Sequence, residues 1–261
     1  MASHEGYTVD DDLAIPPLLD HGFRVDTIPW DDPHTDWDRY DLVIVRSTWN
    51  YQQRVEEFVE TLARIEARAP RLENPLPLLR WNLDKKYLRD LEARGVPTIP
   101  TLWLDRLEPG ALPDLLDELD AAAMVLKPRV GAGAHGAWRL DRDNLHAHAP
   151  VIETRYRDAP LMLQPFVDSV IQEGECSLIY FGGEFSHALQ KIPKPGDYRS
   201  QEEFGSELRP LTPPADLRAA ADRALAAAPT DTPPLYPRVD LVRAPDSSPT
   251  APPRWLALEL V

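Results

Sequence analysis

Residues 126–136 read LKPRVGAGAHG. They continue an apolar run over residues 121–129 that is typical of a buried strand, and they place Lys127 just before a loop of small residues. Such a loop lets backbone N–H groups come close to phosphate oxygens. No Gly-Lys-Ser/Thr follows the glycines, which excludes a Walker A loop. Two interpretations stay open: a phosphate-binding loop, and a β-hairpin with a mobile tip.

The glycines of this loop also fit the spacing G-x-G-x-x-G of dinucleotide-binding enzymes, at Gly131, Gly133 and Gly136. In those enzymes a helix follows the glycines, whereas residues 137–140 have the pattern of another strand. A nicotinamide-dependent enzyme is therefore a further hypothesis. A helix directly after the loop would support it, and a strand would exclude it.

Upstream of the loop, strand-like and helix-like patterns alternate. An amphipathic helix is expected over residues 52–69, where apolar side chains recur at helical spacing. Strands are expected over residues 23–30, 41–48 and 72–75. The βαβ order predicts a parallel sheet, and hence an α/β domain over residues 1–76.

The first expected element is a helix over residues 10–21, with an acidic start and Gly22 at its end. Nothing strand-like precedes this helix, although α/β domains of this kind usually begin with a strand. We therefore expect the first strand of the domain to be missing from the chain.

Downstream of residue 77 the patterns indicate antiparallel strands with helices. Helices are expected over residues 78–94 and 215–228, and a polar, turn-rich loop over residues 191–205. Gly182-Gly183 has the sequence of a hairpin turn. A Pro/Ser/Asp-rich loop is expected before the last strand. The expected strands are 97–104, 121–129, 137–140, 161–167, 176–181, 185–189, 236–243 and 255–261.

The composition limits the function classes. The net charge of −15 argues against nucleic acid or a membrane surface as a partner. No apolar stretch is long enough to span a bilayer, and the N-terminus has no signal-peptide pattern, so a cytoplasmic protein is expected. The single cysteine, Cys176, excludes an internal disulfide and is expected in the core.

Lysine is rare, with five residues against 23 arginines. A lysine that persists under such a bias indicates a site where the broad guanidinium of arginine does not fit, as in a phosphate-lined cleft. The lysines form three groups: Lys85 with Lys86, Lys127 alone, and Lys191 with Lys194.

Two carboxylates lie inside the apolar closing strands. Asp240 and Glu259 are each flanked by Val or Leu, and an acid in such a strand is costly unless it faces solvent or a cation. If the two strands pair, the carboxylates meet, and an oxygen-only donor set suits Mg²⁺ on a nucleotide. The alternative is that both residues lie on an exposed face.

Taken in order, these segments resemble the ATP-grasp superfamily. The set comprises Asp84-Lys85 before Gly95-Val96-Pro97, Lys127-Pro128 with its loop, residues 163–167, Lys191 and Arg199, and Asp240 with Glu259. Residues 46–51, 174–178 and 186–188 are similar to the branch of D-cycloserine-forming ligases. Residues 197–201 with Gly205 are also similar to ribosomal-protein-modifying glutamate ligases. The implied fold combines α/β and α+β parts: a pre-ATP-grasp domain over 1–76 and two ATP-grasp subdomains over 77–166 and 167–261.

The resemblance implies a role for each motif. Lys191 and Arg199 would be catalytic, facing the γ-phosphate. Asp240 and Glu259 would hold Mg²⁺. The substrate would contact Arg46, Ser47, Thr48 and Asn50. ATP would be bound by Lys85, Lys127, Gly131, Gly133, Gly136, Gln164, Pro165, Phe166, Val167 and Glu175.

The implied activity is an ATP-dependent ligase. A small carboxylate would be activated as an acyl phosphate and joined to an amine-type nucleophile, as an intramolecular ring closure in the cycloserine case. The alternatives are a carboxylate–amine ligase on an amino acid or peptide, and an ATP-binding module without chemistry. The oligomeric state stays open, with a homodimer among the options.

One departure from the family pattern concerns the last strand. Family members usually carry Glu-x-Asn or a similar acid pair there, whereas this chain has Ala257 and Val261 two positions to either side of Glu259. One metal ligand is therefore expected to be replaced or cut off, and both ends of the chain look trimmed, which would fit an impaired enzyme.

Overall fold

The computed structural model describes residues 10–245 and 254–261. The chain forms two compact units that divide between Trp81 and Asn82. Two expectations lie outside the described residues. One is that no strand precedes residue 10. The other is the Pro/Ser/Asp-rich loop before the last strand, most of which falls in residues 246–253. Among the described residues, no helix has the length and apolarity that crossing a membrane requires.

The first unit is built around two short parallel strands. β1 (Val43–Ile44) pairs with β2 (Leu72–Glu73), and the helix α2 (Val55–Arg68) connects them. This confirms the predicted βαβ order. α2 buries Phe58, Thr61, Leu62 and Ile65 because these residues recur every three or four positions. The remaining elements are η1 (Asp11–Ala14), α1 (Ile15–Asp20), η2 (Trp37–Arg39), η3 (Trp49–Gln53) and most of α3 (Leu76–Leu83), whose last two residues belong to the second unit.

The predicted strand over residues 23–30 is wrong, because residues 23–29 are irregular. Phe23 stays exposed, and Trp30 is buried by contacts other than strand pairing. The Trp30 ring packs edge-on against Phe58 of α2 at 5.0 Å, and its Nε1 donates a hydrogen bond to Asn50 Oδ1 (2.7 Å). Trp30 is thus used for packing on α2 rather than for a sheet.

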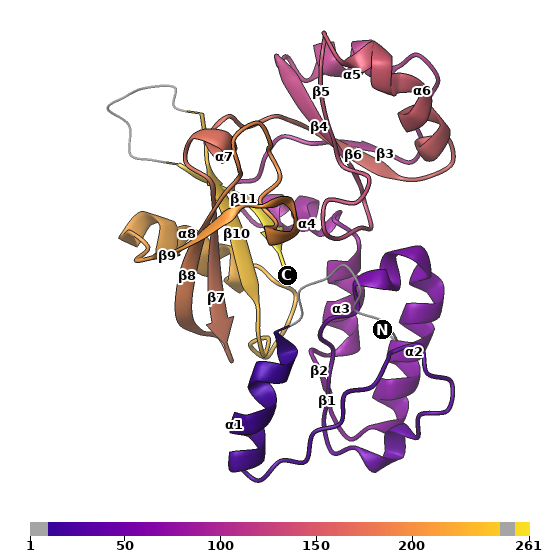
Figure 1. The fold of residues 1–261 in the computed structure, drawn as a ribbon, viewed down its shortest axis with the longest axis vertical. Coiled ribbons are helices and arrows are strands. Elements are labelled where there is room, and N and C mark those ends of the chain that lie inside the picture. The colour runs from indigo at the N-terminus through magenta and orange to yellow at the C-terminus, as the bar shows by residue number, and fades with distance from the viewer. Residues whose placement is uncertain (1–9, 246–253) are drawn as a thin grey trace. The chain divides into compact units, whose positions relative to one another are not determined.

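The second unit contains a four-stranded antiparallel sheet in the order β3-β6-β4-β5. The strands are β3 (Leu102–Leu104), β4 (Ala123–Pro128), β5 (Trp138–Asp141) and β6 (Leu161–Pro165). Two helices, α5 (Leu112–Glu118) and α6 (Leu145–Tyr156), pack on one face, as Figure 1 shows. The core on that face includes Met124, Leu126, Leu140, Leu161 and Leu163, and burying such a side chain contributes roughly 1.5–3 kcal/mol.

Strand alternation places different residues on the other face of this sheet. Val125 pairs with both Arg139 and Gln164, so these three positions share that face, and Lys127 shares it two residues further along β4. The strand β5 directly follows the glycine loop. The nicotinamide hypothesis is therefore excluded, because it requires a helix at this position.

The helix predicted over residues 78–94 is wrong as a single element. It is interrupted at Asp84–Lys86, between α3 and α4 (Tyr87–Ala93). Two backbone donors are diverted at the break: Lys85 N–H donates to Arg129 O (2.9 Å) and Lys86 N–H donates to Asp84 Oδ1 (2.9 Å). In a continuous helix both would bond to carbonyls four residues earlier.

The second sheet of this unit has five antiparallel strands in the order β11-β10-β7-β8-β9. They are β7 (Glu175–Phe181), β8 (Glu184–Ile192), β9 (Glu207–Leu211), β10 (Arg238–Arg243) and β11 (Trp255–Leu260). The hairpin at Gly182-Gly183 is confirmed, and both glycines have positive φ angles. The loop predicted over 191–205 begins two residues later than predicted, because β8 continues to Ile192. β9 was not expected.

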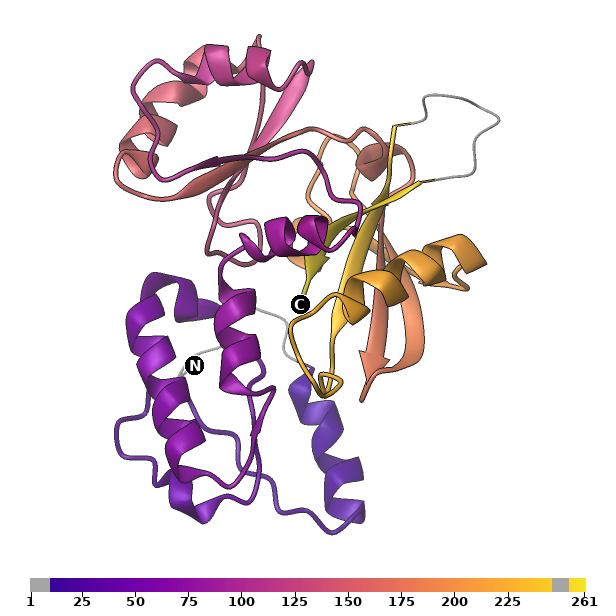
Figure 2. The same ribbon diagram turned by 180° about the vertical axis from the view of Figure 1, so that it is seen from behind.

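Helix α8 (Ala215–Ala226) packs along one face of the five-stranded sheet, which Figure 2 shows from behind. Its alanines at 220, 221 and 224 allow a close approach to β10 and β11. Tyr180 of β7 reaches α8, where its hydroxyl donates to Asp222 Oδ1 (2.7 Å). The odd-numbered β7 residues therefore point to the opposite face. The short elements α7 (Ser169–Gln172) and η4 (Glu202–Phe204) complete the unit.

Candidate active site

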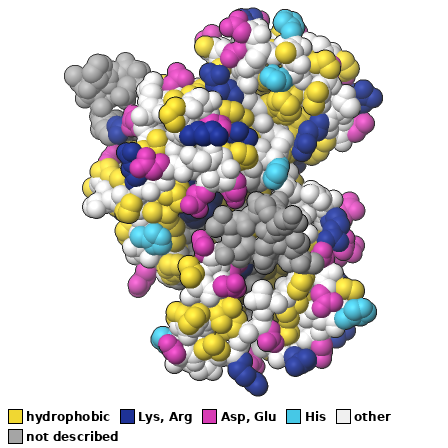
Figure 3. Space-filling view, viewed as in Figure 1, with side chains coloured by type: hydrophobic (Ala, Val, Ile, Leu, Met, Phe, Trp, Pro, Cys, Tyr) yellow, Lys and Arg dark blue, Asp and Glu magenta, His cyan; other side chains and the backbone are white. Residues whose placement is uncertain are grey.

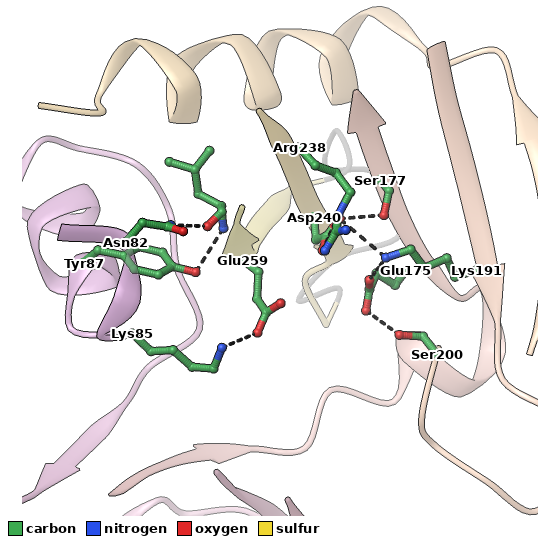
Figure 4. Close-up of polar contacts among 11 residues, drawn as sticks. Asn82, Lys85, Tyr87, Glu175, Ser177, Lys191, Ser200, Arg238, Asp240 and Glu259 are labelled. Atoms are coloured by element: carbon green, nitrogen blue, oxygen red, sulfur yellow. Dashed lines mark hydrogen bonds and ion pairs between the residues drawn. The ribbon is translucent and has the colours of Figure 1, made fainter. Parts of the chain in front are cut away.

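The sheet face opposite α8 carries a row of polar residues. Asp240 of β10 pairs in register with Glu259 of β11 on one side and with Ser177 of β7 on the other. Glu175 of β7 pairs with Lys191 of β8. Paired residues in antiparallel strands lie on one face. Asp240 and Glu259 are therefore neighbours on one face, as predicted (Figure 4). That face is not exposed, because Asp240 is buried and Glu259 is half-buried.

Asp240 is the most deeply buried of these acids, with 1% of its surface exposed. Its carboxylate accepts hydrogen bonds from Ser177 Oγ (2.6 Å) and from Nε and Nη2 of Arg238 (2.9 and 2.8 Å), and Lys191 Nζ lies 3.7 Å away. Burial acts to raise the pKa of Asp240, but Arg238 and Lys191 outweigh it and lower the pKa to about 2. Asp240 is thus a permanent anion at neutral pH.

Glu175 connects the strand pair to the loop after β8. One of its oxygens accepts from Lys191 Nζ (2.8 Å) and the other from Ser200 Oγ (2.7 Å). Glu175, Ser200 and Lys191 are all largely buried. Glu175 is therefore paired with the lysine opposite it on β8.

Glu259 meets a lysine from the helix break. Lys85 Nζ donates to Glu259 Oε1 at 2.7 Å. The residues on either side of the break are bound to the same strand: Asn82, near the end of α3, donates from Nδ2 to Leu260 O (2.6 Å), and Leu260 N–H donates to the hydroxyl of Tyr87, the first residue of α4 (3.1 Å). These contacts fix the start of α4 against the end of β11 (Figure 4).

Lys127 joins this group from the four-stranded sheet. Its Nζ donates to Gln164 Oε1 at 3.4 Å, and Gln164 in turn donates to Thr101 Oγ1 (3.0 Å). Burial lowers the pKa of Lys127, with a further decrease from Lys85, while Glu259 and Glu175 act in the opposite direction. Lys127 therefore interacts electrostatically with the pair of Lys85 and Glu259 and with Glu175.

The glycine loop is anchored at its end. A Cβ atom on Gly136 would meet the Arg155 guanidinium at 2.6 Å and the Tyr156 hydroxyl at 2.8 Å, so only glycine fits there. The Tyr156 hydroxyl donates to Gly136 O (2.6 Å). Gly133 and Gly136 both have positive φ angles. The contacts of Gly136 fix the end of the loop that leads into β5. Gly131 lies at the other end of the loop.

Four residues predicted to bind ATP, Gln164–Val167, lie at the end of β6 and directly after it. Phe166 N–H donates to Ala123 O (2.8 Å), so this backbone donor is already used within the sheet. The Phe166 ring lies under the Arg139 guanidinium, 4.7 Å away, and edge-on to Tyr198 at 6.2 Å. Pro165 ends β6 and Val167 is buried.

Tyr198 and Arg199 lie in the loop between β8 and β9. The Tyr198 hydroxyl donates to Ala137 O (3.3 Å), one residue before β5. It therefore binds the backbone between the glycine loop and β5. Arg199 pairs with Asp197 (2.7 Å) and stacks on the Phe204 ring at 3.6 Å.

The four residues predicted to contact substrate lie in the first unit, directly after β1. Arg46 and Ser47 both bond to Asp11, at 2.9 and 2.5 Å. Thr48 N–H donates to Arg46 O (2.8 Å) in a tight turn. Asn50 accepts the bond from Trp30 described above.

Sequence reasoning missed Arg238, Ser177 and Ser200. Arg238 could have been found, because it lies two residues before Asp240 on the same strand and so shares its face. Ser177 and Ser200 lacked any sequence signal, since their pairing with Asp240 and Glu175 arises from strand register and loop path.

Comparison with known proteins agrees with this geometry. A family model described as "D-cycloserine synthetase DcsG, N-terminal domain" matches residues 1–74, and one described as "Prokaryotic glutathione synthetase, ATP-grasp domain" matches residues 111–217. The cycloserine biosynthesis protein DcsG of Streptomyces lavendulae is 35% identical, over 91% of this chain and 84% of that protein.

Solved structures give the same result. The crystal structure of D-cycloserine synthetase DcsG superposes with a TM-score of 0.80 and 32% identity, covering 95% of this chain and 86% of that one. A D-alanine–D-alanine ligase from Bacillus anthracis, solved in complex with ATP, has a TM-score of 0.56 and 18% identity, over 85% of this chain and 68% of that one, and shares the fold.

The fold and the sequence relationships define an ATP-grasp ligase, an enzyme class that forms C–N bonds with ATP. Within this class the chain belongs to the family of D-cycloserine synthetase DcsG. The predicted superfamily, its branch and its fold class are thereby confirmed.

Proposed function

We propose that this enzyme activates a small-molecule carboxylate as an acyl phosphate and closes a ring by attack of an amine-type group in the same molecule. The observation that carries the proposal is the register pair of Asp240 and Glu259, which lies among Lys85, Lys127 and Lys191. The relationship to D-cycloserine synthetase DcsG supports the ring-closing outcome.

The charges of the site suit a polyphosphate. Lys85, Lys191 and Arg238 are each paired with a carboxylate, so their charges are already held in place. Preorganised cations of this kind stabilise the negative charge that develops during phosphoryl transfer without further reorganisation. We assign Lys85 and Lys127 to the α- and β-phosphates, and Lys191 and Arg199 to the γ-phosphate.

The donor set fits Mg²⁺. Asp240 and Glu259 offer carboxylate oxygens side by side, and Mg²⁺ is commonly held by one or two carboxylates together with phosphate oxygens. Among the described residues, no group of three or more His, Cys, Asp or Glu forms a complete all-protein site. Ala257 does not take part, because it is buried in the sheet and its N–H donates to Pro97 O. Bound Mg²⁺ would neutralise phosphate charge.

The reaction follows from these roles. A carboxylate oxygen of the substrate forms a bond to the γ-phosphorus as the bond to ADP breaks. The amine then bonds to the acyl carbon, loses a proton, and expels phosphate. Because an acyl phosphate is easily hydrolysed, water has to be excluded. We assign this task to the loop with Gly131, Gly133 and Gly136, whose base is fixed by Tyr156.

The remaining assignments follow the same logic. We assign adenine to Gln164, Pro165, Phe166 and Val167. Glu175 would hold Lys191, and the substrate would contact Arg46, Ser47, Thr48 and Asn50.

We place the reaction in the cytoplasm, with a small molecule as partner and neither nucleic acid nor membrane. On the face seen in Figure 3, acidic and basic side chains are interspersed rather than gathered by sign.

An assay of ADP and phosphate release with Mg²⁺ and a panel of amino-acid derivatives tests the proposal. Ring closure predicts turnover with a single added substrate. In mass spectrometry the product should then be lighter than that substrate by one molecule of water. Turnover only with a carboxylate and a separate amine would instead support intermolecular ligation. Thermal stabilisation by nucleotide without turnover would indicate a binding module.

A further inference from the structure

The break between α3 and α4 is held by contacts from a distant strand. The Arg129 guanidinium, directly after β4, binds both oxygens of Asp84: Nε donates to Oδ1 at 3.1 Å and Nη2 donates to Oδ2. The Arg129 side chain is only 11% exposed. A bidentate pair of this kind fixes orientation as well as distance, because the planar fork matches the carboxylate.

The backbone adds two further constraints at the same place. Lys85 N–H donates to Arg129 O, and the same Asp84 oxygen that pairs with Arg129 Nε accepts from Lys86 N–H. Asp84 is therefore both the partner of Arg129 and the acceptor that stops the helix. Residues 84–86 are bound to the end of β4 through one backbone bond and one charged fork.

The residue held between these contacts is Lys85. The break lets its ammonium reach Glu259 on β11, as described above. Lys127 lies on β4 two residues before Arg129, so a single anchor fixes the backbone of both lysines. Asp84 also stays ionised at neutral pH: burial acts to raise its pKa, but the Arg129 and Lys86 contacts lower it overall.

We propose that Asp84 and Arg129 are positioning residues, which set the separation of Lys85 and Lys127 for binding nucleotide phosphates. The inference rests on the proposed function and extends it to a pair to which that proposal assigns no contact with substrate. Neither residue is replaceable by its nearest relative, since Asn lacks the charge and Lys lacks the fork.

A double-mutant cycle on nucleotide affinity tests the pair. Calorimetry would give the Kd of Mg·ATP for the wild type, Asp84→Asn, Lys85→Ala and the combined variant, alongside each Tm. Asp84→Asn keeps an oxygen that accepts from Lys86 N–H, so it removes chiefly the charged fork. Asp105→Asn is the matched control, because Asp105 is the second, highly exposed partner of Arg129 (3.0 Å, 90% exposed).

We expect Asp84→Asn to raise the Kd at least fivefold and Asp105→Asn to leave it within twofold. In the Lys85→Ala background Asp84→Asn should cause little further loss, because its effect acts through Lys85. A general structural role would instead give additive losses of affinity, and that result overturns the inference. If Asp84→Asn does not fold, Arg129→Lys is tested against the same criteria.

The two levels of the proposal fail differently. If the wild type does not bind Mg·ATP, the proposed function fails and the inference falls with it. If the wild type binds and both Asp84→Asn and Arg129→Lys bind equally well, only the positioning role is wrong.

Discussion

Asp240 and Glu259 lie directly opposite each other on β10 and β11, and each is neutralised by its own cation. Arg238 binds Asp240 at 2.8 Å, and Lys85 binds Glu259 at 2.7 Å. Two adjacent carboxylates would otherwise repel, and one would take up a proton. Instead the pKa of both acids is lowered: burial acts to raise it in each case, but the neighbouring cations outweigh burial. Both carboxylates are thus ionised, as the proposed Mg²⁺ site requires.

Replacing Asp240 by Asn should abolish the activity that depends on Mg²⁺. The change removes one of two anionic donors and leaves Arg238 and Lys191 without their shared partner. We expect kcat to fall at least 100-fold in an ADP-release assay, with saturation shifted to higher Mg²⁺. Asp222→Asn, on α8 at the opposite face of the sheet, serves as the control and should keep wild-type activity. Wild-type Mg²⁺ dependence in Asp240→Asn would show that this acid is not a ligand.

The same residue predicts an acid-dependent loss of stability. The pKa of Asp240 is lowered from 3.8 to about 2, so its ionisation stabilises the folded state above pH 4. That contribution, roughly 2 kcal/mol at 1.36 kcal/mol per pKa unit, is lost as the pH falls from about 4 to about 2. Urea unfolding of the wild type and Asp240→Asn should therefore differ most above pH 4 and converge near pH 2. A constant difference over this range would contradict the assignment.

Lys127 should be required for nucleotide binding, and arginine should not replace it. Lys127→Ala removes a buried cation beside Gln164, and Lys127→Arg introduces a wider group into the same space. Calorimetric titration with Mg·ATP should show at least a 50-fold loss of affinity for both variants. Lys194→Ala, at an exposed lysine, should bind like the wild type. Retained affinity in Lys127→Ala would refute the phosphate role.

Tyr198→Phe should loosen the strand that follows the glycine loop. The variant keeps the ring that packs on Phe166 but loses the hydroxyl that bonds to Ala137, the residue before β5. A neutral hydrogen bond of about 1 kcal/mol corresponds to roughly fivefold faster opening. Hydrogen exchange of peptides covering residues 131–140 should increase accordingly, while peptides from α8 should not change. Equal exchange in both proteins would mean that the loop is held without Tyr198.

Much of the site could be predicted because its signals are local. Lys127 with its loop, and the acids flanked by Val and Leu on the closing strands, are visible in the sequence. The pairing of Asp240 with Glu259 required only that the two strands be neighbours, which consecutive antiparallel strands usually are.

The parts that could not be predicted depend on distant partners. Residues 84–86 have the pattern of a helix interior, and only the bonds of Lys85 N–H and Asp84 to Arg129 reveal the break. Residues 23–29 have the apolar alternation of a strand but no strand to pair with in the described part of the chain. Such outcomes are decided by tertiary contacts that override local preference.

The central claim, activation of a carboxylate as an acyl phosphate, is tested most directly by following oxygen. The substrate is prepared with ¹⁸O in its carboxylate, turned over with Mg·ATP, and the released phosphate is analysed by mass spectrometry. Our account predicts one ¹⁸O atom in phosphate for each product molecule, because a carboxylate oxygen bridges to phosphorus and leaves with it. Phosphate free of ¹⁸O during product formation would contradict the account.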